Sequence, residues 1–455
     1  MYRKNYHIHF VGIGGIGMSG IAELLLSLGY TVSGSDIKTG HITRRLENQG
    51  ALIFDQHSAD QVGEANVVVT STAISGDNPE VVQAREFGIP IIQRAEMLAE
   101  LMRIKYSIAV SGAHGKTSTT SMIAQVLNTA GLDPTVIVGG LLKNLDTNAL
   151  HGKGDYIVAE ADESDGSFLK YAPAIAAVTN IDLEHLDFYK DIEDIKEKFL
   201  RFIHSVPFYG VSVLCLDDEH IQDLLPSIKV RYMTFGMTAQ ADVQAKEIAF
   251  EGTSSSFKVI FKGEPLGKIE LNLSGRHNIS NALAAVSVGL ELEVRFETIK
   301  RALEKIEGVK RRLETKGEKN GVLVMDDYGH HPTEIVATLQ AVRESFPEKR
   351  MVVLFQPHRY TRTQKLFNDF ATSFYRSDRL ILLPVYAASE PVIEGVDSSK
   401  LAEAIRDHGH KNVSYAADFK EVISTLAEEL KPNDLVLTLG AGDIYTLGED
   451  LLDAM

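Results

Sequence analysis

Short apolar runs alternate with longer amphipathic stretches along most of the chain. Near the N-terminus, the runs at 7–11, 31–36, 67–71 and 89–92 predict buried strands, and the stretch that ends at Leu28 predicts a helix. Such an alternation of strands and helices is typical of an α/β unit with a parallel sheet. The first ~100 residues therefore form one unit in our prediction.

The same alternation returns twice. An apolar run that ends at Val110 predicts a strand, Lys116 opens a predicted helix, and the region 210–267 is rich in predicted strands. Further buried strands are expected at 156–160, 174–179, 322–327, 350–355, 379–383 and 434–439. Strand-helix series that restart near Lys105 and after Gly308 indicate domain boundaries there. We predict an α/β protein with three domains, at residues 1–104, 105–309 and 310–455.

Composition fits this organisation and excludes several classes of partner. The chain has 455 residues, which suggests three domains at about 150 residues each. Its net charge of -16 argues against nucleic acid and anionic membranes, which would repel it. The one cysteine, Cys215, stands in an apolar run and is expected to be a packed core thiol. Without an apolar run of membrane length or a cleavable signal, we expect a cytoplasmic protein with no membrane insertion.

The stretch 106–120 carries the clearest chemistry. Gly112 and Gly115 allow a tight turn after a strand, and Lys116 and Thr117 then open a helix. Backbone N–H groups at such a turn bind phosphates, the lysine reaches the terminal phosphates, and the threonine hydroxyl can bind magnesium. The usual nucleotide loop has a further glycine where Val110 stands, so this loop is a shortened variant.

A second glycine-rich turn follows the first predicted strand. Glycines at 12, 14 and 17, with Asp36 about 20 residues further on, have the spacing of a dinucleotide fingerprint. The pattern predicts a diphosphate at a helix N-terminus without saying which nucleotide carries it. Residues 71–73 follow a strand end, where they are either ligand contacts or a plain turn.

Acidic residues gather after two predicted strands of the middle region. The first strand is followed by Glu160, Asp162, Glu163 and Asp165, and the second by Asn180, Asp182, Glu184, His185 and Asp187. Beside a phosphate loop, such oxygen and imidazole groups favour one or two hard cations that bridge phosphate oxygens. A solvated acidic loop is the simpler alternative.

Later polar groups also lie at predicted element ends. Asn278 and Asn281 share a face at a helix start, where they either cap the helix or bind adenine or phosphate. In the last domain each strand ends in polar residues, at 326–331, 356–362, Tyr386 and 440–443. Because parallel strands bind ligands at their carboxyl ends, this row predicts a binding edge.

Taken together, these motifs resemble the Mur ligases, from near Tyr6 to near Gly448. The matching stretches are GIGGIGMS at 12–19, SGAHGKT at 111–117, EADESD at 160–165, His185 with Asp187, GRHN at 275–278 with Asn281, DDYGHHP at 326–332 and QPHRYTR at 356–362. The resemblance implies a Rossmann-like N-terminal domain, a central P-loop ATPase domain with a mostly parallel sheet, and a Rossmann-like C-terminal domain.

The resemblance also implies a reaction, and among Mur ligases the match favours the branch that adds L-alanine to UDP-N-acetylmuramate. The lactyl carboxylate of the sugar nucleotide would attack the γ-phosphate of ATP, with Mg²⁺, to give an acyl phosphate and ADP. The amine of L-alanine would then displace phosphate and form the amide. A monomer or weak homodimer is expected.

Roles for residues follow from the motif match. The implied catalytic set is Lys116, Glu160, His185, Asn278, Asn281, Arg312 and Asp327. ATP would meet Gly112, Ala113, His114, Gly115, Lys116, Thr117 and Ser118, and magnesium would be held by Thr117, Glu160 and His185. The UDP part would meet Gly12, Gly14, Gly15, Gly17, Met18, Ser19, Asp36, Ser71, Thr72 and Ala73. His330, Arg359 and Arg362 would lie near the amino acid and the muramyl group.

One departure and three alternatives bear on this interpretation. Several sister ligases have a carbamylated lysine about 15 residues beyond the metal-binding histidine, where this chain has Leu200 and Arg201. A murein-recycling ligase that attaches a tripeptide shares most motifs. A nicotinamide-dependent dehydrogenase would explain only the first glycine loop, and a nucleotide-binding protein without chemistry would leave the acidic and basic groups unexplained.

Overall fold

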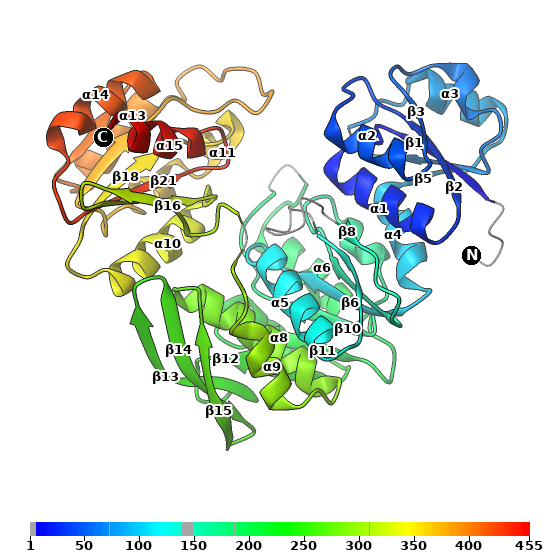
Figure 1. Cartoon of the computed structure of the whole chain (residues 1–455), viewed down its shortest axis with the longest axis horizontal. Coiled ribbons are helices and arrows are strands. Elements are labelled where there is room, and N and C mark those ends of the chain that lie inside the picture. Colours follow the sequence, from blue (N-terminus) through cyan, green and yellow to red (C-terminus); the bar gives the residue numbers. More distant parts are fainter. Residues whose placement is uncertain (1–5, 72, 139–148, 186–187, 309) are drawn as a thin grey trace. The chain divides into compact units, whose positions relative to one another are not determined.

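The computed structural model describes residues 6–71, 73–138, 149–185, 188–308 and 310–455, and its elements form three sheets (Figure 1). Asp187 and Thr72 lie outside the described residues. The described part divides into two compact units, of which one contains the first sheet and most of the second, and the other contains the third sheet. The fold is a three-domain α/β arrangement, as predicted.

The first sheet is parallel, with the strand order β3-β2-β1-β4-β5. Its strands are β1 His7–Val11, β2 Thr31–Ser35, β3 Leu52–Phe54, β4 Val67–Thr70 and β5 Ile91–Gln93. Its helices are α1 Ile16–Ser27, α2 His41–Asn48, α3 Pro79–Glu86 and α4 Arg94–Met102, with a 3-10 turn at Ala59–Val62. The sequence predicted all of these strands except β3.

The second sheet has the order β15-β14-β13-β12-β11-β10-β6-β9-β7-β8. The strands are β6 Tyr106–Ser111, β7 Thr135–Ile137, β8 Ala149–Leu150, β9 Tyr156–Glu160, β10 Ile175–Val178, β11 Val211–Cys215, β12 Tyr232–Gly236, β13 Val243–Glu251, β14 Ser254–Phe261 and β15 Glu264–Leu271. The helices are α5 Lys116–Thr129, α6 Ile192–Ile203, α7 Glu219–Leu224, α8 Arg276–Glu291 and α9 Phe296–Leu303, with 3-10 turns at Ser167–Lys170 and Leu225–Ser227.

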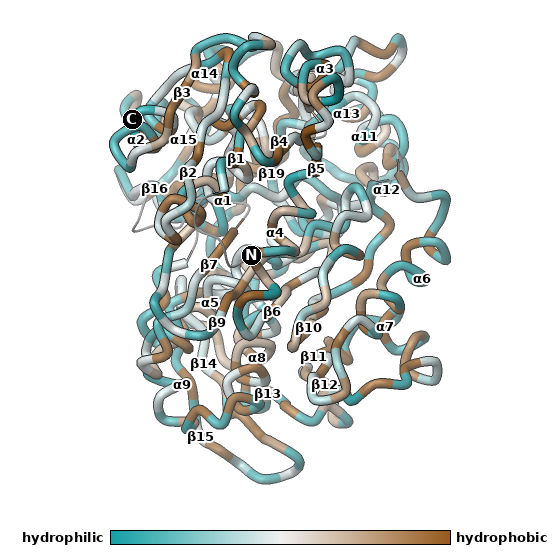
Figure 2. The backbone as a smooth tube through the Cα atoms, turned by 90° about the vertical axis from the view of Figure 1, so that its right-hand side faces the viewer, coloured by the Kyte–Doolittle hydropathy of each residue, from teal (hydrophilic) through white to brown (hydrophobic). Residues whose placement is uncertain are grey.

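Helix α6 illustrates how this domain builds its core. Figure 2 shows hydrophobic and hydrophilic segments alternating along it, as expected for a helix with one buried face. Phe199 and Phe202 point inward, and each ring centre lies 5.2 Å from the ring of Phe168. Cys215 is buried nearby in β11, and burial raises the pKa of its thiol to about 11, as expected for an inert core cysteine.

The third sheet has the order β16-β17-β21-β18-β19-β20, and only the β16-β17 pair is antiparallel. Its strands are β16 Glu314–Lys319, β17 Val322–Asp327, β18 Arg350–Phe355, β19 Arg379–Leu382, β20 Val413–Tyr415 and β21 Asp434–Leu439. The helices are α10 Pro332–Ser345, α11 Tyr360–Lys365, α12 Phe367–Ala371, α13 Ser398–Asp407, α14 Phe419–Glu429 and α15 Tyr445–Ala454.

Both faces of the third sheet are buried. Alternate residues of β18 belong to different core clusters, with Val353 and Phe355 in one and Val352 and Leu354 in the other. Parallel strands covered on both faces read as continuous apolar runs, which is why the sequence predicted β17, β18, β19 and β21. Among the described residues, none of the helices has the length and apolarity needed to cross a membrane.

Gly34 of β2 provides a test of the packing in the first sheet. An added Cβ would lie 2.6 Å from the Phe10 carbonyl oxygen and 2.8 Å from Ile13 Cβ. We expect Gly34→Ala to lower the stability of this domain by about 1–3 kcal/mol, as overpacking does. Thermal melting followed by circular dichroism measures the loss.

Gly63 is the matched control for this substitution. It has a helical backbone (φ -57°), and an added Cβ would meet nothing within 4 Å. Gly63→Ala should leave the melting temperature unchanged or raise it slightly, because alanine reduces the freedom of the unfolded chain. Equal melting temperatures for the two variants would contradict the tight packing of β1 against β2.

Candidate active site

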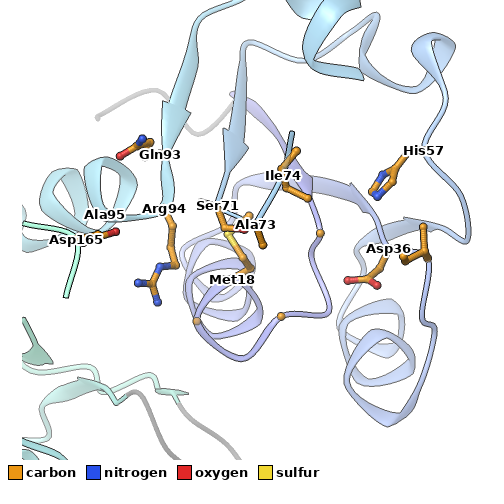
Figure 3. A pocket seen from close by; sticks show the side chains of 14 residues that line it. Met18, Asp36, His57, Ser71, Ala73, Ile74, Gln93, Arg94, Ala95 and Asp165 are labelled. Carbon is orange, nitrogen blue, oxygen red and sulfur yellow. The ribbon is translucent and has the colours of Figure 1, made fainter. Parts of the chain in front are cut away.

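A cavity of about 390 Å³ opens at the carboxyl ends of the first sheet's strands (Figure 3). Seven of the ten residues predicted to bind the UDP group line it: Gly12, Gly15, Gly17, Met18, Asp36, Ser71 and Ala73. Ser71 and Ala73 line this cavity, and their role as ligand contacts stays a prediction.

The glycine loop at 12–17 has a shape that side chains would prevent. Gly12 has φ +81°, and an added Cβ at Gly14 would lie 2.8 Å from Asp36 Oδ2. That carboxylate oxygen accepts a hydrogen bond from the Gly14 N–H at 2.9 Å. Ser19 lies one turn into α1 and is buried. Asp36 and Gly14 therefore shape the loop.

Sequence reasoning did not assign the other seven lining residues to this cavity. They are Ile37, His57, Ile74, Gln93, Arg94, Ala95 and Asp165. Figure 3 shows Gln93 and Arg94 on one side of the glycine loop and Asp36 with His57 on the other. Apart from Asp165, which the EADESD stretch at 160–165 contains, none belongs to a motif with fixed spacing, because they lie at or after the ends of different strands. Their position after strand ends was the only signal available.

Arg94 supplies the positive charge on its side of the cavity. An added Cβ at Gly17 would lie 2.2 Å from Arg94 Nη1, so the guanidinium rests directly on the glycine loop. Arg94 Nη2 also lies 3.7 Å from Asp162 Oδ2. The cavity thus has a cationic side that meets the loop following β9.

The phosphate loop between β6 and α5 is shaped by residues after β10. Gly112 has φ +138°, and an added Cβ there would lie 2.1 Å from Thr179 Oγ1. The His114 N–H donates to Asn180 Oδ1 at 2.8 Å, and the His114 ring lies 2.8 Å from Asp182 Oδ2. These contacts fix the turn before α5, whose N-terminal N–H groups are suited to an anion.

Lys116 makes a partly buried ion pair at the start of α5. Its Nζ lies 2.8 and 2.9 Å from the two carboxylate oxygens of Glu163, and it donates to the Gly112 carbonyl at 2.6 Å. Burial alone would lower the pKa of Lys116, but the Glu163 carboxylate outweighs burial and raises the pKa above its ordinary value. The lysine is therefore charged.

The remaining residues predicted for ATP follow the loop into the helix. Ala113, Thr117 and Ser118 are partly exposed at the start of α5. Asn281 of α8 is buried, and its Oδ1 accepts a hydrogen bond from Thr119 Oγ1 at 3.1 Å. An added Cβ at Gly115 would lie 2.6 Å from this same oxygen. Asn281 therefore supports the phosphate loop from behind.

The structure forms a possible cation site about His185. The ring Nε2 lies 3.5 Å from Glu163 Oε1 and 3.7 Å from Glu184 Oε2, and one ligand atom from each residue lies within 4.8 Å of the others. Two carboxylates and an imidazole suit a divalent cation. His185 has φ +55°, a conformation uncommon for histidine that positions ligands at functional sites.

The predicted metal set was Thr117, Glu160 and His185, so the cluster contains one of its members. Glu160 ends β9 and is partly buried, three residues before Glu163. Its pairing with His185 stays a prediction. Leu200 and Arg201, which stand where sister ligases carry a lysine, lie on α6.

The other compact unit contains Asn278, Arg312 and Asp327. The Asn278 amide donates to the Ser274 carbonyl at 2.8 Å. Asp327 is buried, and it accepts hydrogen bonds from the Leu313 and Gly329 N–H groups, both at 2.8 Å. Burial raises the pKa of Asp327, although Arg312 opposes the shift. The Asp327 carboxylate therefore fixes the backbone at Leu313, near the start of the third domain, and at Gly329.

His330 and Arg362 both contact His358, a histidine that was not among the predicted site residues. The rings of His330 and His358 have centres 5.9 Å apart, Arg362 Nη1 lies 3.4 Å from His358 Nδ1, and Tyr386 stacks on His358. Burial, with His330 and Arg362, lowers the pKa of His358 to about 4. Arg359 lies beside them at φ +72° and pairs with a different group. Aromatic and cationic side chains therefore gather at this edge, and ligand binding there stays a prediction.

Comparison with known proteins agrees with this geometry. Three family models match in succession: the "Mur ligase family, catalytic domain" at residues 7–106, the "Mur ligase middle domain" at 110–289 and the "Mur ligase, glutamate ligase domain" at 311–442. The chain belongs to the Mur ligase family.

Relatives of this Mur ligase extend the match over the whole chain. The UDP-N-acetylmuramate–L-alanine ligase of Desulforapulum autotrophicum is 69% identical over 455 residues, covering 100% of both chains. That of Desulfosudis oleivorans is 60% identical and covers 99% of both. Among solved structures, UDP-N-acetylmuramate–alanine ligase MurC of Thermotoga maritima is 30% identical, with a TM-score of 0.80 and 98% of each chain covered.

The recycling alternative also has a solved representative. A murein peptide ligase of Psychrobacter arcticus is 25% identical to this Mur ligase, with a TM-score of 0.67 and coverage of 99% and 98% of the two chains. The dehydrogenase alternative has no such support, because the family match covers the phosphate loop and the glycine loop together.

Gly115 tests the shape of the phosphate loop. It has φ +81° and leaves no room for a Cβ beside Asn281, so Gly115→Ala should distort the turn before α5. We expect at least a tenfold loss of affinity for a fluorescent ATP analogue, about 1.4 kcal/mol or more. Titration of the analogue into the purified Mur ligase measures it.

Gly131 is the matched control, since it has φ +78° but an added Cβ would meet nothing within 4 Å. Gly131→Ala imposes a comparable backbone strain away from the loop and should lower only the melting temperature. If Gly131→Ala lowers the affinity for the analogue as much as Gly115→Ala does, the shape of the phosphate loop does not determine that affinity.

Proposed function

We propose that this Mur ligase joins L-alanine to the lactyl carboxylate of UDP-N-acetylmuramate at the expense of ATP. The observation that carries the proposal is 69% identity over the full chain to a UDP-N-acetylmuramate–L-alanine ligase. The murein peptide ligase, at 25% identity, is far less similar. The enzyme then belongs to peptidoglycan precursor synthesis and works in the cytoplasm, where its substrates are available.

The reaction has two steps that balance. A carboxylate oxygen of the sugar nucleotide attacks the γ-phosphorus of ATP, and the bond to ADP breaks to leave an acyl phosphate. The amine of L-alanine attacks the acyl carbon, loses a proton, and expels inorganic phosphate to form the amide. Two anions must approach each other in the first step, so positive charge at the site is the main requirement.

Lys116 and the start of α5 meet this requirement for ATP. The turn from 112 to 115 presents N–H groups, and neither Gly112 nor Gly115 has room for a side chain, as a phosphate cradle needs. Lys116 already lies over the turn, bonded to the Gly112 carbonyl and Glu163. Exchange of the Glu163 carboxylate for phosphate oxygens would keep the lysine's charge neutralised.

Magnesium fits the donor set beside this loop. Thr117, Glu160 and His185 are the proposed ligands, and Glu163 and Glu184 lie close enough to His185 to contribute. When bound, the ion supplies positive charge to the phosphate oxygens. The chain's own residues orient the substrates: Asn281 supports the loop, and His114 is held by Asn180.

The 390 Å³ cavity is the proposed site of the UDP-muramyl group. The glycine loop faces the diphosphate and Asp36 lies on the nucleoside side, as in other glycine-loop folds. Arg94 then lies on the opposite side, next to the 162–165 loop whose Glu163 holds Lys116. A UDP-muramyl group bound in this orientation would have its lactyl carboxylate on the side of the cavity that faces the ATP site.

The domain bounds 1–104, 105–309 and 310–455 remain our assignment, and the family-model ranges support them. The last domain supplies Arg312, Asp327, His330, Arg359 and Arg362. We assign these to ATP and to the amino acid on motif match, together with Asn278. The His330, His358 and Arg362 cluster supports a carboxylate-binding role.

ADP release tests the proposed reaction. With ATP, Mg²⁺ and UDP-N-acetylmuramate present, we expect release that depends on L-alanine and a product heavier by one alanyl residue in mass spectrometry. Glycine, L-serine and the recycled tripeptide are the comparison acceptors. Preference for the tripeptide would make the protein a recycling ligase, and no release with any acceptor would refute ligase activity.

Lys116→Ala should abolish turnover while leaving the fold intact, because the transferring phosphoryl group would lose the positive charge of Lys116. We expect kcat to fall by about 10³-fold or more, in the range of a lost charge-stabilising group. Circular dichroism checks folding. The control is Lys300→Ala, at a partly exposed position of α9, which should keep normal turnover. Near-normal activity of Lys116→Ala would contradict the phosphate-loop assignment.

A further inference from the structure

A buried carboxylate lies directly behind the nucleotide cavity. Glu80, in the first turn of α3, is 0% exposed. Its Oε2 accepts a hydrogen bond from Ser35 Oγ at 2.6 Å and lies 3.0 Å from His57 Nδ1, while its Oε1 lies 3.3 Å from His9 Nε2. In the orientation that satisfies its amide, Gln61 also donates to Oε1, at 2.7 Å.

Glu80 is ionised despite its burial. Burial alone would raise its pKa, but hydrogen bonds from His9, Ser35 and His57 outweigh burial and lower the pKa below its ordinary value. An ionised carboxylate has only acceptor atoms. Each group that contacts it must therefore present a hydrogen.

This requirement fixes the proton on His57. Nδ1 faces Glu80 and Ser35, so Nδ1 carries the hydrogen in the neutral ring, and Nε2 on the opposite edge has a lone pair. His57 lines the cavity, and its side chain is 18% exposed. No hydrogen bond of Nε2 is found among the residues that the structure describes. Whenever the ring is neutral, the cavity therefore meets an acceptor nitrogen.

The position of His57 identifies the part of the ligand that it faces. Asp36 follows β2, where glycine-loop folds bind the ribose, and His57 lies on that same side of the cavity in Figure 3. Ile37 lines the same part of the wall and is 71% exposed, so an apolar surface is available to a planar base. His57 and Ile37 together surround the base end.

We propose that Glu80 is a positioning residue that holds His57 as an acceptor for the N3–H of uracil, which makes the cavity selective for uridine over cytidine nucleotides. Uracil N3 carries a hydrogen, whereas cytosine N3 has a lone pair that would face the lone pair of Nε2. The inference rests on the proposed function only in assigning this cavity to the UDP group.

Affinities for UDP and CDP, measured by calorimetry on the full chain, test the proposal. The wild-type protein should bind UDP at least about tenfold more tightly than CDP, the size of one net hydrogen bond. His57→Ala removes the acceptor and should bring the two affinities together. A His57→Ala variant that weakens UDP and CDP equally would overturn the proposal.

Glu80→Gln separates positioning from direct contact. The amide no longer requires a hydrogen on Nδ1, so the UDP preference should fall by about tenfold in this variant. In the His57→Ala background the same substitution should change the preference no further, because Glu80 acts through His57. A further change of similar size in that background would overturn the positioning role.

The tautomer can be observed without any substitution. Nitrogen-15 NMR of His57 in the wild-type protein should show a neutral ring with hydrogen on Nδ1, and a ring with hydrogen on Nε2 or on both nitrogens would overturn the proposal. This measurement decides the question even if Glu80→Gln fails to fold. His9→Gln is the matched control: it keeps a donor toward Glu80 and should leave the UDP preference unchanged.

The outcome is separable from that for the ligase activity. Selective UDP binding without alanine-dependent ADP release would refute the proposed reaction and leave the role of Glu80 standing. Alanine-dependent ADP release, together with an unchanged UDP preference in His57→Ala, would support the proposed reaction and refute the role of Glu80.

Discussion

The contact between Lys116 and Glu163 is the interaction on which the first compact unit's chemistry depends. It joins the start of α5 to the loop after β9, and that same loop sends Asp162 toward Arg94 and Asp165 into the nucleotide cavity. The glycine turn at 112–115 and the 390 Å³ cavity are therefore both linked to one short segment, 162–165. Any movement of this segment alters both sites at once.

A positive charge buried without a partner is costly, and a phosphate site must nevertheless have one ready. Glu163 resolves this conflict by neutralising Lys116 while the phosphate is absent, and the Gly112 carbonyl holds the ammonium in place. The same carboxylate lies 3.5 Å from His185 Nε2. Glu163 therefore contacts both Lys116 and His185. Binding of the nucleotide and a cation would change which charged groups this carboxylate contacts.

The sequence predicted what is local and missed what is brought together by folding. Apolar runs located most strands, and glycine spacing located both tight glycine turns, because these signals lie within about 20 residues. Glu163 was visible as one acid among four, and only the folded loop distinguishes it from Glu160 as the partner of Lys116. His57 and Arg94 belong to no motif, since their positions depend on strand order in the sheet.

Strand order also explains why polar side chains gather at the predicted edges. In each sheet the parallel strands end together, so side chains far apart in the chain meet at the carboxyl edge: His57 with Asp36, His114 with Asp182, and His330 with His358. The edge rule predicts where such groups gather. Which atom each presents is decided one layer deeper, by groups such as Glu80, whose burial and charge determine the hydrogen on a neighbouring ring.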